Sequence, residues 1–399
     1  MAQAVRIVPH NAISLRFALG VKGACIERWY QCGAGKQTLV GGGLWRRLMA
    51  ADRPNAVAVA ATNIERRLAW LYLRSATEPY RLADHARVRP RRTRHSQTET
   101  APSMGLAVRD MTPLPFGQTG LLVTRVGFGA MHFDGIDDEA EIGRLLNGVL
   151  DLGVNLIDTA RGYGRSEERI GRHLRHRRHE LVLSTKFGYG VEGVADWTYP
   201  CIVQGVERAL RQLQTDFIDI GHLHSCPLHV LQRGEVCEAL ADCVKAGKLR
   251  VAAYSGENAE LAYALLDARF SSVQCSLSLV DPANKAQIAH TAKGVLAKRT
   301  LAGLAWARHQ RPDDFCEGQY WDRWQELHLP DLGLPWPELA LRWTAFTPGI
   351  SSVLIGTRSL ARLREGIEAV ERGPLQGETL LALQVAHAQA GADRWPGLI

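Results

Sequence analysis

The 399-residue chain lacks the features that mark membrane, secreted and metal-binding proteins. No apolar run approaches the roughly 20 residues that span a bilayer, and the N-terminus has no compact apolar core of a secretory signal. No CxxC pair occurs, and no cysteine has metal-like spacing to a histidine, so we expect no metal site. The eight cysteines are scattered, at positions 25, 32, 201, 226, 237, 243, 275 and 316. Scattered thiols indicate a reducing compartment, and we therefore expect a cytoplasmic protein that does not bind membranes.

Acidic residues are scarce in the first part of the chain only. Residues 1–110 contain 18 Lys and Arg against 7 Asp and Glu, whereas residues 111–399 contain 30 against 34. The formal net charge of +7 therefore arises from the N-terminal part. Because the larger part is mildly acidic, its composition argues against nucleic acid as a partner.

Residues 1–110 also lack a sustained hydrophobic period of the helical or the strand kind. The stretch 87–103 is rich in Arg, Ser and Thr and has little apolar surface to bury, which predicts a disordered linker. An organellar transit segment, and a basic arm that binds nucleic acid or an anionic surface, are alternatives. We interpret residues 1–110 as a basic, disordered extension with no assigned function, followed by a domain over residues 111–399.

From Met111 onward, strand-like and helix-like patterns alternate. LPFGQTGLLVTRVGFGA predicts a β-hairpin that turns at Gln118-Thr119-Gly120, and helical periods follow at 139–153, 199–214 and 233–248. Eight strands are predicted, at 122–128, 154–158, 181–185, 217–223, 249–254, 272–277, 294–298 and 351–355. Eight strand–helix units in about 290 residues predict an α/β fold, the (β/α)8 TIM barrel. A doubly wound sheet is the alternative, but GFGAMHFDG after the first strand lacks the GxGxxG spacing, so any nicotinamide cofactor is not held in the Rossmann manner.

Four polar residues stand at or just after successive strand ends. Asp158 ends the second strand, Tyr163 lies in the loop after it, Lys186 ends the third strand and His224 ends the fourth. In a barrel these ends meet at the C-terminal mouth, where barrels carry their chemistry. His222 would face the same side as His224, because strand side chains alternate.

Together these four residue types can protonate a carbonyl oxygen while a hydride is added to the carbon. A free phenol, with a pKa of about 10, is a poor acid at neutral pH, but a nearby ammonium lowers the pKa of a phenol. An aspartate keeps such an ammonium charged and oriented through a charge-assisted hydrogen bond. A histidine can orient the carbonyl or relay the proton. The set therefore predicts a site for carbonyl reduction.

Residues 111–399 resemble the aldo-keto reductase superfamily over nearly their whole length. The similar stretches are FGQTGLLVTRVGFGA, DLGVNLIDTARGYGRSEERIGRHL, LVLSTKFG, QTDFIDIGHLHSC, VAAYSGEN and PGISSVLIGTRSLARLREGIEAV. The resemblance implies a TIM barrel that binds the nicotinamide cofactor in an extended pose, with NADPH preferred over NADH. It also implies that the catalytic residues are Asp158, Tyr163, Lys186 and His224.

The resemblance further implies a set of cofactor contacts. Ser255 and Gln274 match the residues that hold the carboxamide, and Arg299 follows the seventh strand. The residues expected to contact the rest of the cofactor, including its 2′-phosphate and adenine, are Gly356, Thr357, Arg358, Arg362 and Glu365. Three positions depart from the family pattern: Gly256 and Gly366 replace asparagines, and Lys298 replaces an aromatic residue that stacks on the nicotinamide.

We therefore expect an NADP-dependent oxidoreductase that reduces small aldehydes or ketones, with hydride from the nicotinamide and a proton from Tyr163. One alternative is a cofactor-binding regulatory subunit with little turnover. Another is a sugar or polyol dehydrogenase that runs in the oxidative direction on the same site. The residues leave the natural substrate and the oligomeric state open.

Overall fold

The computed structural model describes residues 111–399 and four short strands that precede them. These strands are β1 (Ile13–Ser14), β2 (Gly20–Val21), β3 (Ala24–Cys25) and β4 (Gln31–Cys32). β1 pairs with β4 and β2 pairs with β3, both antiparallel. The basic extension was predicted over residues 1–110, and apart from these four strands it lies outside the described residues.

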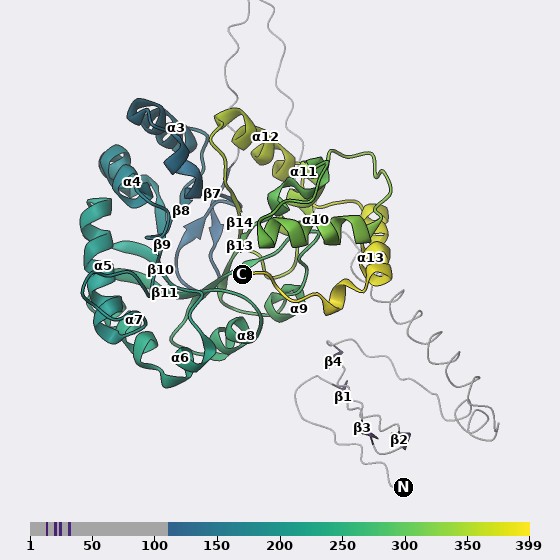
Figure 1. Ribbon diagram of the computed structural model, residues 1–399, viewed down its shortest axis with the longest axis horizontal. Helices are drawn as coiled ribbons and strands as arrows, with labels where there is room; N and C mark the ends of the chain where they lie inside the picture. Colours follow the sequence, from purple (N-terminus) through teal and green to yellow (C-terminus); the bar gives the residue numbers. More distant parts are fainter. Residues whose placement is uncertain (1–12, 15–19, 22–23, 26–30, 33–110) are drawn as a thin grey trace, which may run out of the picture. The chain divides into compact units, whose positions relative to one another are not determined.

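Eight parallel strands close into a barrel with helices around it (Figure 1). The strands are β7 (Val126–Gly129), β8 (Leu156–Asp158), β9 (Val182–Phe187), β10 (Ile218–His224), β11 (Leu249–Ser255), β12 (Ser272–Ser276), β13 (Gly294–Lys298) and β14 (Ser352–Ile355). The barrel closes where β14 pairs with β7, with Val353 opposite Val126. This order confirms the predicted TIM barrel and excludes the doubly wound sheet, whose sheet is open.

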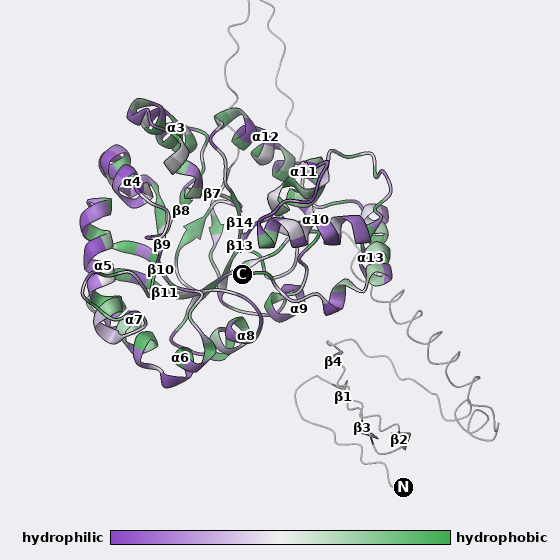
Figure 2. Ribbon diagram, in the orientation of Figure 1, coloured by the Kyte–Doolittle hydropathy of each residue, from purple (hydrophilic) through white to green (hydrophobic). Residues whose placement is uncertain are grey.

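The α-helices of residues 111–399 lie between the strands or follow the last one. They are α3 (Glu139–Asp151), α4 (Ser166–Leu174), α5 (Tyr199–Leu213), α6 (Leu228–Arg233), α7 (Glu235–Lys245), α8 (Asn258–Leu266), α9 (Lys285–Ile288), α10 (Phe315–Leu327), α11 (Trp336–Ala345), α12 (Leu360–Glu371) and α13 (Gly377–Ala390). Short 3-10 helices occur at Met131–Gly135, Arg175–Glu180, Ala302–Ala307 and Ala392–Arg394. Figure 2 shows hydrophobic strands inside and hydrophilic outer faces on α4 and α5, as amphipathic helices that pack on one side require.

A short hairpin closes the N-terminal end of the barrel. Its strands are β5 (Leu114–Pro115) and β6 (Leu122–Val123), which pair antiparallel as predicted. Phe116 is fully buried and packs with inward-facing strand residues such as Ile220. A Cβ atom on Gly294, at the start of β13, would lie only 2.7 Å from the Phe116 ring. Glycine at this position therefore lets the ring enter the barrel.

The predicted strand 122–128 is wrong in one respect, because the structure divides it into β6 and β7. Thr124 lies between them, and its backbone N–H donates to Oδ1 of Asn155 at 2.8 Å. The Thr124 hydroxyl donates to the carbonyl oxygen of Val126 at 2.7 Å. These side-chain hydrogen bonds replace ladder bonds, so the chain bends from the hairpin into the barrel.

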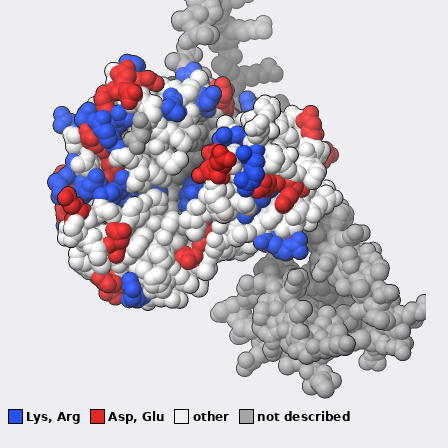
Figure 3. All heavy atoms as spheres, viewed as in Figure 1, with Lys and Arg blue, Asp and Glu red and all other residues white. Residues whose placement is uncertain are grey.

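Arginines gather over α4, but they are paired with acids. Arg165 lies 3.3 Å from Glu139 and 3.1 Å from Glu168, and Arg172 also contacts both carboxylates. Figure 3 shows the resulting mixture of positive and negative side chains on this face. Such exposed pairs neutralise one another and contribute little stability individually.

In the described part of the chain, no helix combines the length and the apolar character needed to cross a membrane. The cysteines at 201, 226, 237, 243, 275 and 316 all carry free thiols. Within residues 111–399, no group of three or more His, Cys, Asp or Glu side chains is arranged to hold a metal ion.

Candidate active site

A buried ion pair lies at the C-terminal mouth of the barrel. Lys186, near the end of β9, places Nζ 2.7 Å from Oδ2 of Asp158, the last residue of β8. The same ammonium donates to the carbonyl oxygen of Thr159 at 2.8 Å. Burial alone would lower the pKa of Lys186, but the Asp158 carboxylate and the Tyr163 hydroxyl outweigh it and hold that pKa above its usual value. Lys186 is therefore a charged ammonium inside the barrel at neutral pH.

The Asp158 carboxylate is held by side chains from the neighbouring strand β9. Burial alone would raise its pKa, but Lys186, His222 and the Ser184 hydroxyl outweigh burial and keep that pKa below its usual value. Ser184 Oγ donates to Oδ1 of Asp158 at 2.7 Å and lies 3.0 Å from Nε2 of His222. His222 is fully buried, and burial lowers its pKa to about 3. His222 therefore contacts the Asp158 carboxylate indirectly, through the Ser184 hydroxyl, inside the barrel.

Tyr163 and His224 lie on the outer side of this ion pair. The Lys186 ammonium is 5.0 Å from the centre of the Tyr163 ring. The ring of His224, at the end of β10, meets Tyr163 edge-on with centroids 6.2 Å apart. Both rings are half-buried. The structure therefore brings all four predicted residues, Asp158 included, around one point of the mouth.

His224 is electrically neutral in this environment. Burial, followed by the positive charges of Lys186 and Lys298, lowers its pKa to about 3. A neutral imidazole carries one N–H donor and one acceptor nitrogen. One of these nitrogens, Nδ1, lies 2.7 Å from the hydroxyl oxygen of Tyr189. Sequence reasoning missed Tyr189, although its position between two glycines in TKFGYG was a usable signal.

Ser255 and Gln274 lie side by side on β11 and β12. Their α-carbons are paired, and Ser255 Oγ donates to Oε1 of Gln274 at 2.9 Å. Nε2 of Gln274 is buried and has no hydrogen-bond partner among the described residues. An unsatisfied buried amide donor is costly, and a carboxamide oxygen would satisfy it. The pair therefore fits the amide group of a nicotinamide.

Gly256 departs from the family pattern for a steric reason. A Cβ atom at this position would lie 2.2 Å from the hydroxyl oxygen of Tyr254. Tyr254 is buried, so its ring cannot easily move aside. An asparagine side chain therefore does not fit here, and the hydrogen bond that the family pattern implies for position 256 is absent from this chain.

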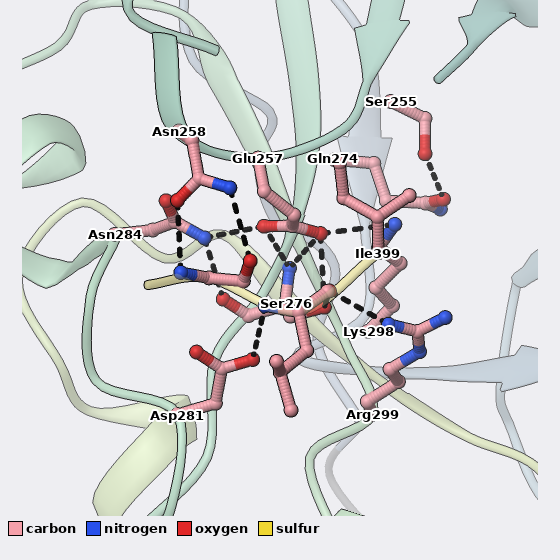
Figure 4. Close-up of polar contacts among 12 residues, drawn as sticks. Ser255, Glu257, Asn258, Gln274, Ser276, Asp281, Asn284, Lys298, Arg299 and Ile399 are labelled. Carbon is pink, nitrogen blue, oxygen red and sulfur yellow. Dashed lines mark hydrogen bonds and ion pairs between the residues drawn. The ribbon is translucent and has the colours of Figure 1, made fainter. Parts of the chain in front are cut away.

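Lys298 forms an ion pair where the family pattern has an aromatic ring. Its Nζ lies 3.0 Å from Oε1 of Glu257, a fully buried residue (Figure 4). Glu257 also accepts hydrogen bonds from the backbone N–H and the hydroxyl of Ser276 and from Asn284 Nδ2. The carboxylate thus has a full set of partners, which a buried charge requires. Neither Glu257 nor this pairing was predicted from the sequence.

The C-terminal residues lie against the same side of the mouth. Asn258 contacts Gly397 twice, through Nδ2 to the carbonyl oxygen at 3.0 Å and through Oδ1 to the N–H at 2.8 Å. Arg299 Nη1 donates to the carbonyl oxygen of Leu398 at 2.7 Å, and the Leu398 side chain is buried (Figure 4). Arg299, predicted as a cofactor contact, therefore holds the tail of its own chain in this structure.

The remaining predicted cofactor residues form a second group around the N-terminus of α12. Gly356, Arg358, Arg362 and Glu365 are exposed there, and Thr357 is half-buried. Arg358 Nη1 donates to the carbonyl oxygen of Gly135 at 2.9 Å. Exposed guanidinium groups beside a helix N-terminus suit an anionic phosphate.

Gly366 packs α12 onto the barrel in place of the family's asparagine. A Cβ atom on Gly366 would lie 2.5 Å from Cδ1 of Ile355 on β14. A side chain at this position would therefore push the helix away from the strand.

Comparison with known proteins gives one consistent result. The chain matches the family model described as "Aldo/keto reductase family" over residues 125–385, which include every strand of the barrel. It is 28% identical over 294 residues to the uncharacterized oxidoreductase YqkF of Bacillus subtilis, covering 67% of this chain and 94% of that protein. It is 26% identical over 308 residues to L-galactose dehydrogenase of Arabidopsis thaliana, covering 70% and 95%. Among solved structures it is similar to aldo-keto reductase AKR11C1 from Bacillus halodurans in its holo form, with a TM-score of 0.62 and 25% identity, covering 69% of this chain and 96% of that one.

Proposed function

The chain belongs to the aldo/keto reductase family and is an oxidoreductase of carbonyl compounds, and on that premise we propose that it reduces small aldehydes or ketones with NADPH. The observation that carries the proposal is the buried Lys186–Asp158 ion pair, whose ammonium lies 5.0 Å from the centre of the Tyr163 ring. A fixed cation beside a phenol stabilises negative charge on the phenol oxygen. It therefore assists transfer of the Tyr163 proton to another atom.

Tyr163 donates the proton to the carbonyl oxygen in this proposal. Lys186 stabilises the phenolate that remains, and Asp158 keeps Lys186 charged and oriented. The side chains of Lys186 and Asp158 are both buried, so the surrounding protein restrains them in this arrangement. A general acid positioned in this way contributes about 10²- to 10⁴-fold to the rate.

His224 orients the carbonyl in the same proposal. As a neutral ring it presents a hydrogen-bond donor without giving up a proton of its own. Its edge-on placement against Tyr163 supports two donors that converge on one oxygen. Such convergence favours the negative charge that develops on the oxygen during reduction.

Two groups of residues would hold the cofactor. Gln274 Nε2, a buried donor without a partner among the described residues, would bind the carboxamide together with Ser255. Arg358 and Arg362 would bind the 2′-phosphate, which is the reason to propose NADPH rather than NADH. When bound there, a reduced nicotinamide would supply the hydride for the carbonyl carbon.

A second candidate function is oxidation of a sugar or polyol on the same site. The relative L-galactose dehydrogenase supports this direction, and the chemistry of Tyr163 and Lys186 is reversible. A regulatory subunit with little turnover draws less support, because the four residues of the tetrad lie together. We propose a small molecule rather than nucleic acid or membrane as the partner, and a cytoplasmic location remains an expectation from the scattered thiols.

The test is a turnover assay in both directions. Purified protein is given NADPH or NADH with aromatic, aliphatic and dicarbonyl compounds, and NADP⁺ or NAD⁺ with sugars and polyols. The proposal expects NADPH oxidation on at least one carbonyl class and slower turnover with NADH. Faster oxidation of a sugar or polyol would favour the second candidate, and tight cofactor binding without turnover in either direction would contradict both.

A further inference from the structure

A tyrosine outside the predicted tetrad controls the ring of His224. Tyr189 lies in the loop after β9, and its hydroxyl oxygen is 2.7 Å from Nδ1 of His224. The two rings also stack, with centroids 5.6 Å apart and an interplanar angle of 28°. One side chain therefore restrains both the position and the rotation of the imidazole.

Three glycines make this contact possible. Gly188 and Gly190, on either side of Tyr189, have φ angles of 138° and 71°, values that residues with a side chain rarely adopt. At Gly162 a Cβ atom would lie 3.0 Å from the Tyr189 hydroxyl oxygen. Gly188 and Gly190 thus supply backbone angles that favour glycine, and Gly162 leaves room for the Tyr189 hydroxyl.

The hydrogen bond links the tautomer of His224 to the direction in which the Tyr189 hydroxyl points. A phenol can donate or accept, but among the described residues only His224 lies within hydrogen-bonding distance of the Tyr189 hydroxyl. Donation to Nδ1 uses the phenol proton and leaves the single proton of a neutral imidazole on Nε2. The charged and titratable groups that face His224 are Lys186, Lys298, Asp158, His222 and the phenols of Tyr163 and Tyr189.

We propose that Tyr189 is a positioning residue that holds His224 as the Nε2–H tautomer and directs this N–H at the carbonyl oxygen to be reduced. The inference rests on the proposed function. Tyr163 and His224 then supply two separate N–H or O–H donors to one oxygen, and Tyr189 ensures that the imidazole cannot turn its acceptor nitrogen toward the substrate. Tyr189 itself contacts neither the Lys186–Asp158 pair nor Gln274 through any hydrogen bond among the described residues.

The first test is Tyr189→Phe, which keeps the ring and its stacking but removes the hydroxyl. We expect kcat for the best carbonyl substrate to fall about tenfold, the order of one hydrogen bond, while KM and Kd for NADPH stay within twofold of wild type. Tyr199→Phe is the matched control, because its hydroxyl donates to Asp242 on α7 instead, and we expect wild-type kcat. Unchanged kcat in Tyr189→Phe, or a loss matched by weaker NADPH binding, would overturn the positioning role.

The second test reads the tautomer directly by ¹⁵N NMR of histidine-labelled protein, with His224 assigned by its absence from His224→Asn. We expect a protonated Nε2 and a hydrogen-bonded acceptor Nδ1 in the wild type, with the Nδ1 resonance moving downfield in Tyr189→Phe. A protonated Nδ1, or no shift on substitution, would overturn the inference. Because the spectrum needs no substrate, it decides the tautomer even if no carbonyl is reduced and the proposed function fails.

Discussion

Arg299 and Leu398, 99 positions apart in the chain, are joined by a hydrogen bond of 2.7 Å from the guanidinium to the backbone carbonyl oxygen. The Leu398 N–H in turn donates to Oδ2 of Asp281 at 3.2 Å. The last residues of the chain therefore occupy one polar wall of the mouth. The Arg299 N–H that binds the tail is therefore not free to bind a phosphate of the cofactor.

Deleting residues 396–399 tests this competition. Loss of the buried Leu398 side chain should lower the free energy of unfolding by about 2–3 kcal/mol, measured by urea denaturation. The deletion also frees Arg299. We expect Arg299→Ala to weaken NADPH binding severalfold in the shortened chain and hardly at all in the full-length chain. Equal weakening in both backgrounds would show that Arg299 contacts the cofactor while the tail is in place.

Cofactor preference should depend on Arg362. This residue is exposed on the first turn of α12, where a guanidinium can pair with a 2′-phosphate. We expect Arg362→Ala to raise the Kd for NADPH about tenfold and to leave the Kd for NADH within twofold, measured by quenching of tryptophan fluorescence. Arg364→Ala removes the same charge from the same helix and serves as the control. If the two substitutions raise the Kd for NADPH equally, then the overall positive charge of α12 attracts the cofactor, and Arg362 makes no specific contact with it.

Stability should fall in mild acid because two histidines, one fully buried and one half-buried, stay neutral in the fold. The pKa values of His222 and His224 are both lowered to about 3, whereas an unfolded histidine titrates near 6.5. Below about pH 6.5 the unfolded chain binds protons that the folded chain does not, so the stability present above that pH is lost as the pH falls toward 3. Each histidine contributes up to about 1.4 kcal/mol to the free energy of unfolding lost per unit fall in pH.

Urea denaturation between pH 6.5 and 5.0 measures this slope. We expect it to be shallower in His222→Asn and in His224→Asn, by about 1 kcal/mol per pH unit in each, whatever the absolute stability of the variant. An unchanged slope in both variants would mean that these histidines take up protons in the folded protein.

The fold could be predicted because each strand and helix carries its own local pattern. The predicted strands lie within a few residues of the observed ones, and the structure departs at 122–128 because Thr124 binds Asn155, a residue 31 positions away. The grouping of Asp158, Tyr163, Lys186 and His224 followed from strand ends alone, since a closed parallel barrel brings those ends to one mouth. Their catalytic roles remain predictions.

The missed contacts depend on geometry that no local pattern contains. Tyr189 reaches His224 only because the glycine φ angles turn the loop after β9 toward β10. The pairing of Lys298 with Glu257 joins the end of β13 to the loop after β11. Both contacts join residues on different strand–helix units, so their partners became visible only once the barrel had closed.

Whether Tyr163 is the acid of a carbonyl reductase can be measured by steady-state NADPH oxidation in Tyr163→Phe beside the wild type. The phenylalanine keeps the ring against Lys186 and His224 but has no proton to give. We expect kcat to fall at least about 100-fold, as for loss of a general acid, while the Kd for NADPH stays within twofold. Turnover equal to that of the wild type would contradict this role of Tyr163.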